Sequence, residues 1–212
     1  MTQTVWLARH GNRQDFVDSN WHTTAERPHD PGLSPDGIEQ AQELAQRLKA
    51  EPIAHLFASP FLRTVETAHY VAEVLDLPIM LEAGFCEYLN PVWFDAEPSR
   101  LTKQALAGRF PRINLSYHDR VLPAFPETWE MVLERAEKTI RQLVYEFSGD
   151  ILVIGHGATV NAAALGLVTG EAEVSYGLCS LTKLVYKGNA WVIELNGDVS
   201  HLSETEETVR LI

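Results

Sequence analysis

The stretch Leu7-Ala8-Arg9-His10-Gly11-Asn12-Arg13 places a histidine between two arginines at the end of a short apolar run. The run Val5-Trp6-Leu7-Ala8 is compact and lies shortly before a glycine, which is typical of a buried strand. Arg9 and Arg13 are costly to bury without an anionic partner, and they follow the strand where open α/β sheets bind their ligands. The stretch therefore predicts an α/β fold with a phosphate site at the end of its first strand.

His10 is the candidate reactive group of this site. Neighbouring positive charges lower the pKa of an imidazole below its free value of about 6.5, so one ring nitrogen keeps its lone pair at neutral pH. Such an imidazole is suited to nucleophilic attack on phosphorus. A single Arg-His-Gly triplet is also compatible with a hydrogen-bonded structural histidine, so the prediction depends on other segments.

Length and composition predict one α/β domain over residues 1–212. Of the residues, 45% are hydrophobic and 22% are charged, as in soluble globular proteins, and no apolar stretch approaches the roughly 18 residues of a membrane span. The first predicted strand leaves no room for a removable presequence, and Cys86 and Cys179 are too few for a disulfide framework. We therefore expect a cytoplasmic protein without membrane partners.

The net charge of −12 bears on possible partners. Nucleic acid would be repelled over most of the surface, so we expect no nucleic-acid partner. A few converging arginines can still reverse the potential locally and bind a small phosphorylated substrate. The sequence does not predict the oligomeric state.

Strand and helix periodicities alternate along the chain. Strands are predicted at 5–8, 53–58, 79–81 and 151–154, and the runs 181–186 and 190–195 predict a hairpin. Helices are predicted at 35–48 with Ser34 as N-cap, through 61–75, at 127–147 and at 158–167. The alternation predicts a three-layer α/β sandwich, in which helices cover both faces of a mostly parallel, mixed central sheet. Residues 82–126 are expected to form an inserted lid with a short helix near 99–108, and the acidic tail from Ser203 is expected to be loose.

Three strand ends carry the residues that complete the phosphate site. His10 follows the first strand, and His156 follows the strand at 151–154. If these strands are parallel neighbours, both imidazoles emerge at the same edge of the sheet. A further strand ends in Ala58-Ser59-Pro60 and places Arg63 in the first turn of the next helix, where the helix dipole also favours an anion. Arg9, Arg13, Arg63 and His156 would then surround one phosphoryl group on His10.

Four blocks of the chain together resemble the histidine phosphatase superfamily (branch 1), also called phosphoglycerate mutase-like. They are Arg9-His10-Gly11, Leu33-Ser34-Pro35-Asp36-Gly37 with Gln40-Ala41, Ala58-Ser59-Pro60-Phe61-Leu62-Arg63-Thr64-Val65-Glu66-Thr67-Ala68, and Gly155-His156-Gly157. The resemblance implies that His10 becomes a phosphohistidine, that Arg9, Arg63 and His156 bind the phosphoryl oxygens, and that a carboxylate protonates the leaving oxygen. It implies no cofactor and no metal, because the arginines supply the charge stabilisation.

Two carboxylates, Glu82 and Glu87, follow the third predicted strand. The family pattern places its acid late in such a segment, which favours Glu87 and leaves Glu82 as second choice. Either residue is otherwise interpreted as a solvated surface carboxylate, and for Glu82 that interpretation is favoured. A carboxyl group within reach of the leaving oxygen can act first as acid and then as base on water, a role that contributes about 10²- to 10⁴-fold in rate.

Arg13 and the Glu-x-Gly-x-x-Glu-aromatic pattern from Glu82 to Tyr88 resemble one part of the family. This part includes the phosphatase domains of ubiquitin-associated, SH3-containing signalling proteins and the ecdysteroid-phosphate phosphatases. Phosphoglycerate mutases usually carry a Ser and Asn pair after Arg-His-Gly, whereas this chain has Arg13-Gln14-Asp15. The resemblance therefore implies hydrolysis of a phosphomonoester, with mutase-type phosphoryl transfer on a small phosphorylated metabolite as the alternative.

A set of four aromatic residues near Glu87 is expected to pack in the core and the lid, and to offer an apolar wall to an aromatic or bulky leaving group. It consists of Tyr88, Trp93, Phe94 and Trp129.

Two other site classes are disfavoured. His22, His29 and Asp30 lack the tight spacing of metal ligands, so we expect solvated loop residues there. A metallohydrolase would lose activity with a chelator, whereas an enzyme that uses the phosphohistidine mechanism would keep it. A binding module without catalysis is disfavoured because the whole candidate catalytic set is present.

Overall fold

A computed structural model describes residues 3–170 and 172–203. These residues form a six-stranded sheet with the order β3-β2-β4-β1-β5-β6. The strands are β1 (Thr4–Arg9), β2 (Ile53–Ala58), β3 (Ile79–Leu81), β4 (Asp150–Gly155), β5 (Leu181–Lys187) and β6 (Ala190–Asp198). Strands β1 to β4 are parallel, whereas β5 pairs antiparallel with both β1 and β6. The predicted strands and the hairpin are confirmed.

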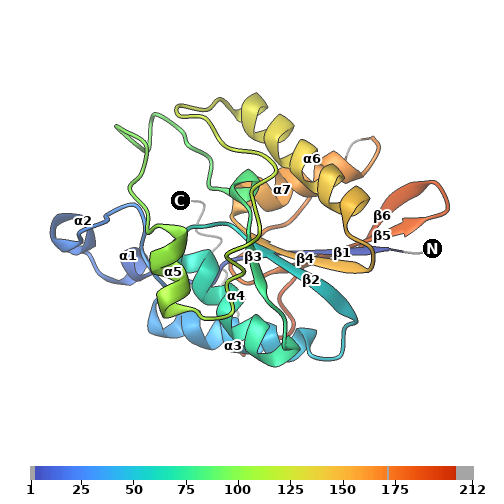
Figure 1. Ribbon diagram of the computed structural model, residues 1–212, viewed down its shortest axis with the longest axis horizontal. Helices are drawn as coiled ribbons and strands as arrows, with labels where there is room; N and C mark the ends of the chain where they lie inside the picture. The colour runs from blue at the N-terminus through green and yellow to red at the C-terminus, as the bar shows by residue number, and fades with distance from the viewer. Residues whose placement is uncertain (1–2, 171, 204–212) are drawn as a thin grey trace.

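Helices cover both faces of this sheet. They are α1 (Gln14–Val17), α2 (Trp21–Thr24), α3 (Pro35–Leu48), α4 (Leu62–Leu75), α5 (Lys103–Arg109), α6 (Trp129–Glu146) and α7 (Gly157–Leu167), with a 3₁₀ turn at Ala83–Phe85. Figure 1 shows α6 and α7 on one face of the sheet and α3 and α4 on the other. The predicted three-layer α/β sandwich is confirmed.

Strand β1 explains why its sequence is apolar without alternation. Side chains of a strand point alternately to opposite faces, and both faces of this strand are covered. Val5 and Leu7 belong to the core that α6 and α7 close, whereas Trp6 and Ala8 belong to the core under α3 and α4. The strand is therefore buried along its length, and its end delivers His10 into the interior of the protein.

Capping residues set the helix starts. Ser34 is the N-cap of α3, as predicted, and its hydroxyl accepts a hydrogen bond from the Gly37 amide at 3.2 Å. Helix α6 begins two residues later than predicted, because the Thr128 side chain caps it and Glu127 lies outside the helix. The short helix predicted near 99–108 is α5, which begins at Lys103 because the Thr102 side chain caps it.

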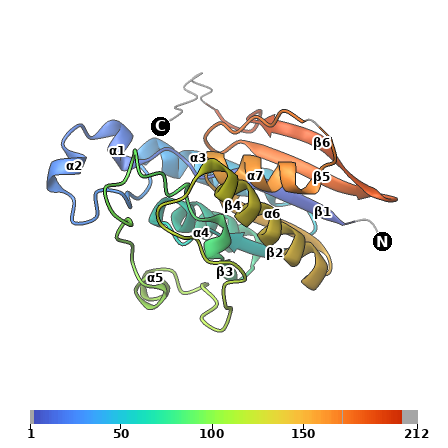
Figure 2. The same cartoon turned by 90° about the horizontal axis from the view of Figure 1, so that it is seen from above.

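The segment 82–126 contains the 3₁₀ turn and α5 and is otherwise irregular. Figure 2 shows its loops on the side of the molecule where α1 and α2 lie. Its action as a lid stays a prediction. Beyond Ser203 the predicted loose tail falls outside the described residues. Within the described part of the chain, no helix combines the length and the apolar character needed to cross a membrane.

Candidate active site

The ends of three parallel strands form the floor of the site. The register pairs Arg9 of β1 with Gly155 of β4, and Ala58 of β2 with Ile154 of β4. The pairing continues into the loops, because the His10 amide donates to the Gly155 carbonyl at 3.1 Å. The predicted neighbourhood of His10 and His156 is confirmed, with ring centroids 5.3 Å apart.

His10 is completely buried and presents one free nitrogen. Its Nδ1 lies 2.7 Å from the Gly11 carbonyl oxygen, which can only accept, so Nδ1 carries the proton and Nε2 keeps the lone pair. Nε2 has no hydrogen-bond partner among the described residues. Burial, followed by the charges of Arg63 and Arg9, holds the pKa of His10 well below its usual value. The imidazole is therefore neutral at pH 7, as the sequence predicts, although burial contributes more than the arginines do.

Gly11 explains the tight turn beside this histidine. A Cβ atom at Gly11 would lie 2.5 Å from the Gly37 carbonyl oxygen of α3, so the loop has no room for a side chain. The Gly11 amide donates to the Thr67 hydroxyl of α4 at 3.2 Å. Helices α3 and α4 thus fix the loop that carries His10.

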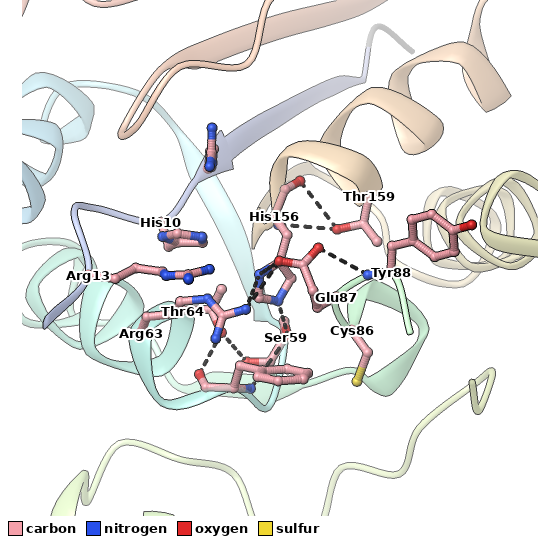
Figure 3. Close-up of polar contacts among 12 residues, drawn as sticks. His10, Arg13, Ser59, Arg63, Thr64, Cys86, Glu87, Tyr88, His156 and Thr159 are labelled. Carbon is pink, nitrogen blue, oxygen red and sulfur yellow. Dashed lines mark hydrogen bonds and ion pairs between the residues drawn. The ribbon is translucent and has the colours of Figure 1, made fainter. Parts of the chain in front are cut away.

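Arg63, Glu87 and His156 form a buried polar cluster opposite His10 (Figure 3). Arg63 Nη2 donates to Glu87 Oε2 at 3.1 Å, and His156 Nδ1 lies 3.2 Å from the same oxygen. His156 Nε2 lies 2.8 Å from the Ser59 hydroxyl. Arg63 Nε and Nη1 are buried and have no hydrogen-bond partner among the described residues. Buried polar groups are nearly always paired, so these two donors mark the place of an anionic ligand.

Burial and neighbouring charges set the protonation states of the three side chains in the cluster. Burial lowers the pKa of His156 to about 4, so its ring is neutral at pH 7. Burial and nearby Arg13 lower the pKa of Arg63 to about 10, which leaves it a cation. Burial alone raises the pKa of Glu87, but His156, Arg63 and His10 outweigh it and bring this pKa well below its usual value. At pH 7 the fixed charge of Arg63 therefore holds Glu87 as a carboxylate.

The charges of two further arginines act on His10 and help to lower its pKa. Arg9 is buried at the end of β1, and its Nη1 donates to the Tyr176 carbonyl at 3.1 Å. The Arg13 guanidinium lies beside His10 (Figure 3) and donates to both oxygens of Asp15, at 2.9 and 2.5 Å. The structure thus brings together all the residues predicted for the phosphate site. The sequence did not predict the contact of Ser59 with His156 or that of Asp15 with Arg13. A serine at a strand end and a carboxylate two residues from Arg13 were the available signals.

Glu82 is not the solvated carboxylate that the sequence favours. It is completely buried, so the expectation of a solvated carboxylate is wrong. Its oxygens accept from the Tyr117 hydroxyl at 2.5 Å and from the Gly84 and Arg120 amides at 2.9 Å. These donors belong to the lid segment and the 3₁₀ turn. Glu82 therefore joins the end of β3 to residues 117–121, and Glu87 is the carboxylate beside His10.

A pocket of about 330 Å³ opens from the cluster. Arg13, Arg63 and Glu87 line it together with an aromatic wall that includes Phe16, Trp93 and Phe94.

Of the four aromatic residues that we expected to form the wall, Trp93 and Phe94 line the pocket. The Tyr88 ring lies edge-on to Trp93 and tilted against Trp129, with ring centroids 5.3 and 5.9 Å away.

The loop residues His22, His29 and Asp30 differ from one another. His22 is exposed and His29 is half-buried, and both line the pocket. Asp30 is buried and accepts a hydrogen bond from the Leu62 amide at 2.7 Å, so the expectation that it is solvated is wrong. It holds the loop against the first turn of α4.

His10, Glu87 and His156 offer ligand atoms that lie within 4.8 Å of one another, a spacing that a metal ion could bridge. The charges around them oppose a cation. Arg63 already pairs with Glu87 at 3.1 Å, and arginine charges help to lower the pKa values of both histidines. The arrangement favours an anion.

Comparisons with known proteins identify the family and agree with the fold. The family model of the histidine phosphatase superfamily (branch 1) matches residues 5–199. The ecdysone phosphate phosphatase from Bombix mori, solved with tungstate, superposes with a TM-score of 0.77 at 22% identity, covering 90% of this chain and 91% of that one.

Curated relatives carry different names. The "Probable phosphoglycerate mutase GpmB" of Proteus mirabilis is 27% identical over 94% of this chain and 95% of its own. The transcription factor tau 55 kDa subunit of Saccharomyces cerevisiae is 27% identical over 98% of this chain, which spans 58% of that relative's length. From the extent of the family match, the chain belongs to the histidine phosphatase superfamily, branch 1.

Proposed function

We propose that the protein hydrolyses a phosphomonoester in two steps through phospho-His10, without a metal. The observation that carries the proposal is a group of three buried atoms in the site that have no hydrogen-bond partner among the described residues: Nε2 of His10, and Nε and Nη1 of Arg63. A phosphoryl group between them would face the nucleophile and accept hydrogen bonds from Arg63, with Arg9 and Arg13 adding positive charge. Fixed donors at the place where charge develops are the largest contribution to many enzymatic rates.

In the first step His10 Nε2 forms a bond to phosphorus, and the bond from phosphorus to the leaving oxygen breaks. Glu87 gives its proton to that oxygen, so the alcohol departs neutral. In the second step water attacks phosphorus, Glu87 takes the proton from the water, and the bond to His10 breaks. Inorganic phosphate leaves, and His10 returns to its neutral form.

Glu87 must acquire a proton before the first step, because it is ionised in the free protein. Phosphate binding brings negative charge next to Glu87 and supplies Arg63 with a second anionic partner. Both changes raise the pKa of Glu87 in the complex. A substrate that arrives as a monoanion can deliver the proton itself.

The need for this proton predicts how kcat/KM depends on pH. The second pKa of a phosphate monoester is about 6, so the monoanion is lost as pH rises through that value. The pKa of His10 lies below its usual value, so acid does not protonate the nucleophile near pH 6.5. We expect kcat/KM to be high below about pH 6 and to fall above it. A profile of kcat/KM over pH 4 to 9 checks this. A decrease in kcat/KM as the pH falls below about 6.5 would contradict it.

The acid is tested by leaving-group dependence. Glu87→Gln should lower kcat/KM for phenyl phosphate by about 10²- to 10⁴-fold, because phenolate is a poor leaving group without a proton. It should lower kcat/KM for p-nitrophenyl phosphate far less, because p-nitrophenolate leaves readily. Glu82→Gln is the matched control: it should lower the melting temperature by disturbing buried hydrogen bonds, yet leave the ratio of the two substrates unchanged. A changed ratio in Glu82→Gln alone would move the acid to that residue.

Chelation tests the metal-independent step. Activity should be unchanged after dialysis against EDTA and unchanged again when Zn²⁺ or Mg²⁺ is restored, because arginines provide the positive charge. Activity that disappears with EDTA and returns with one ion would instead assign that ion to His10, Glu87 and His156.

The pocket supports a bulky or aromatic leaving group, because Phe16, Trp93 and Phe94 line it. Phosphoglycerate mutase activity is the second candidate, favoured by the name of the Proteus relative. Assays with 2- and 3-phosphoglycerate distinguish interconversion from release of phosphate. A cytoplasmic location, a single catalytic domain and a small phosphorylated substrate as partner, rather than nucleic acid, remain part of the proposal.

A further inference from the structure

Helix α6 contributes a buried arginine to the loop that carries Glu87. Arg135 is 5% exposed, and its Nη1 donates to the Gly84 carbonyl at 2.8 Å and to the Cys86 carbonyl at 3.2 Å. Its Nη2 reaches the Glu87 carbonyl at 3.4 Å. One planar guanidinium thus contacts three carbonyl groups in the four residues that end at Glu87.

Glu127 holds both this arginine and the far end of the same loop. Its Oε1 accepts from Arg135 Nε at 2.6 Å, and its Oε2 accepts from Arg135 Nη2 at 2.8 Å. The Leu89 amide donates to Glu127 Oε2 at 3.2 Å, and the Glu127 amide donates to the Leu89 carbonyl at 3.0 Å. We call residues 84–89 the acid loop: Arg135 fixes its first half and Glu127 its end.

Helix α6 packs closely against the acid loop. A Cβ atom at Gly84 would lie 2.1 Å from the Thr139 hydroxyl, one turn along α6 from Arg135. Thr139 in turn donates to the Arg135 carbonyl at 2.7 Å. The loop is therefore seated directly on the helix that carries the arginine.

Fixing the backbone matters because the hold of Arg63 on the Glu87 side chain weakens during the proposed reaction. In the free protein, Glu87 Oε2 is held by Arg63 and lies beside His156. When a phosphoryl group takes hydrogen bonds from Arg63, that support weakens, while the contacts of Arg135 lie outside the phosphate site. A buried ion pair is seldom more stabilising than well-packed apolar residues, so stability alone gives little reason for this one.

We propose that Arg135, oriented by Glu127, is a positioning residue for the general acid, which keeps the Glu87 carboxyl group at the leaving oxygen. The inference rests on the proposed function and adds a residue to it. A misplacement of about 1 Å at a reacting group costs on the order of 10²-fold in rate. The loss must fall on the proton transfers of Glu87, because the side-chain contacts of Arg135 are to the acid loop and Glu127, and kcat/KM reports the first of them, proton donation.

The test uses the double variant Arg135→Met/Glu127→Gln, which leaves no unpaired buried charge, and phenyl and p-nitrophenyl phosphates as probes. We expect kcat/KM for phenyl phosphate to fall about 10²-fold, while that for p-nitrophenyl phosphate changes much less. Arg135→Lys keeps the charge but cannot span the carbonyls, so it should shift the ratio less and in the same direction. If the double variant does not fold, Arg135→Lys carries the comparison.

Two controls separate positioning from general loosening. Leu143→Ala removes a buried side chain from the same helix, eight residues beyond Arg135, and leaves the Arg135 and Glu127 hydrogen bonds in place, so it should lower the melting temperature and leave the substrate ratio unchanged. In a Glu87→Gln background, the Arg135 and Glu127 changes should produce no further selective loss.

Equal losses for both substrates, a shifted ratio in Leu143→Ala, or a persistent selective loss without Glu87 would each overturn the inference. A wild-type protein that hydrolyses neither substrate would instead reject the proposed function, and the inference with it.

Discussion

Replacing His10 by alanine should abolish phosphomonoester turnover, with kcat/KM lower by on the order of 10⁴-fold or more, as for loss of other covalent nucleophiles. The reason is specific to one atom. Within residues 3–170 and 172–203, Nε2 of His10 is buried without a hydrogen-bond partner, whereas the neighbouring His156 contacts Ser59 and Glu87. No other described side chain offers a free imidazole lone pair there.

The measurement is steady-state hydrolysis of p-nitrophenyl phosphate by wild type and His10→Ala. His118→Ala is the matched control, because His118 is exposed in the lid segment and its loss should leave kcat/KM unchanged. Melting temperatures should show that both variants fold. Activity of His10→Ala within about tenfold of wild type, a difference of only 1.4 kcal/mol in barrier, would remove His10 from the reaction.

Arg63→Met should produce the second large effect, lowering kcat/KM by about 10²- to 10³-fold. Arg63 is a buried cation that contacts Glu87, and two of its N–H groups have no hydrogen-bond partner among the described residues. Without it, the transferred phosphoryl group loses its fixed donors and the pKa of Glu87 rises. Arg141→Met, a change of the same type at an exposed site on α6, should leave kcat/KM unchanged.

The same variant should be less stable, by about 3–5 kcal/mol at pH 7, because Glu87 is left buried without its cation. The sign with pH follows from the depressed pKa of Glu87 in the folded protein. Its pairing stabilises the fold above the unfolded value of about 4.3 and is lost as pH falls through the folded value. Urea unfolding should therefore show a difference between wild type and Arg63→Met that shrinks on acidification. A difference that grows on acidification would contradict this assignment of charges.

Local sequence patterns were sufficient for most of the fold and the centre of the site. The apolar runs predict β1 and β4 as buried strands, and His10, Arg63 and His156 follow the ends of β1, β2 and β4 by one to five positions. Ser34 could be predicted as a cap because capping involves only the next few residues. His10, Arg63 and His156 lie where such local patterns place them.

Contacts between distant segments could not be predicted this way. Glu82 is buried because residues 117–121 return to it, and Asp30 because its loop reaches the start of α4. Glu127 reads as the first residue of a helix, yet it pairs with Arg135 under the acid loop. A carboxylate has the same local signature whether it faces solvent or accepts distant donors, so its burial depends on tertiary packing.

Detection of a phosphoryl group on His10 would show the covalent intermediate itself. Glu87→Gln should form the intermediate readily from p-nitrophenyl phosphate but hydrolyse it slowly, because water then lacks its base. Rapid mixing should give a burst of p-nitrophenolate equal to the amount of protein. Mass spectrometry after a neutral quench should place one phosphoryl group on the peptide that contains His10. Turnover without a burst, or with the phosphoryl group on another residue, would contradict the account.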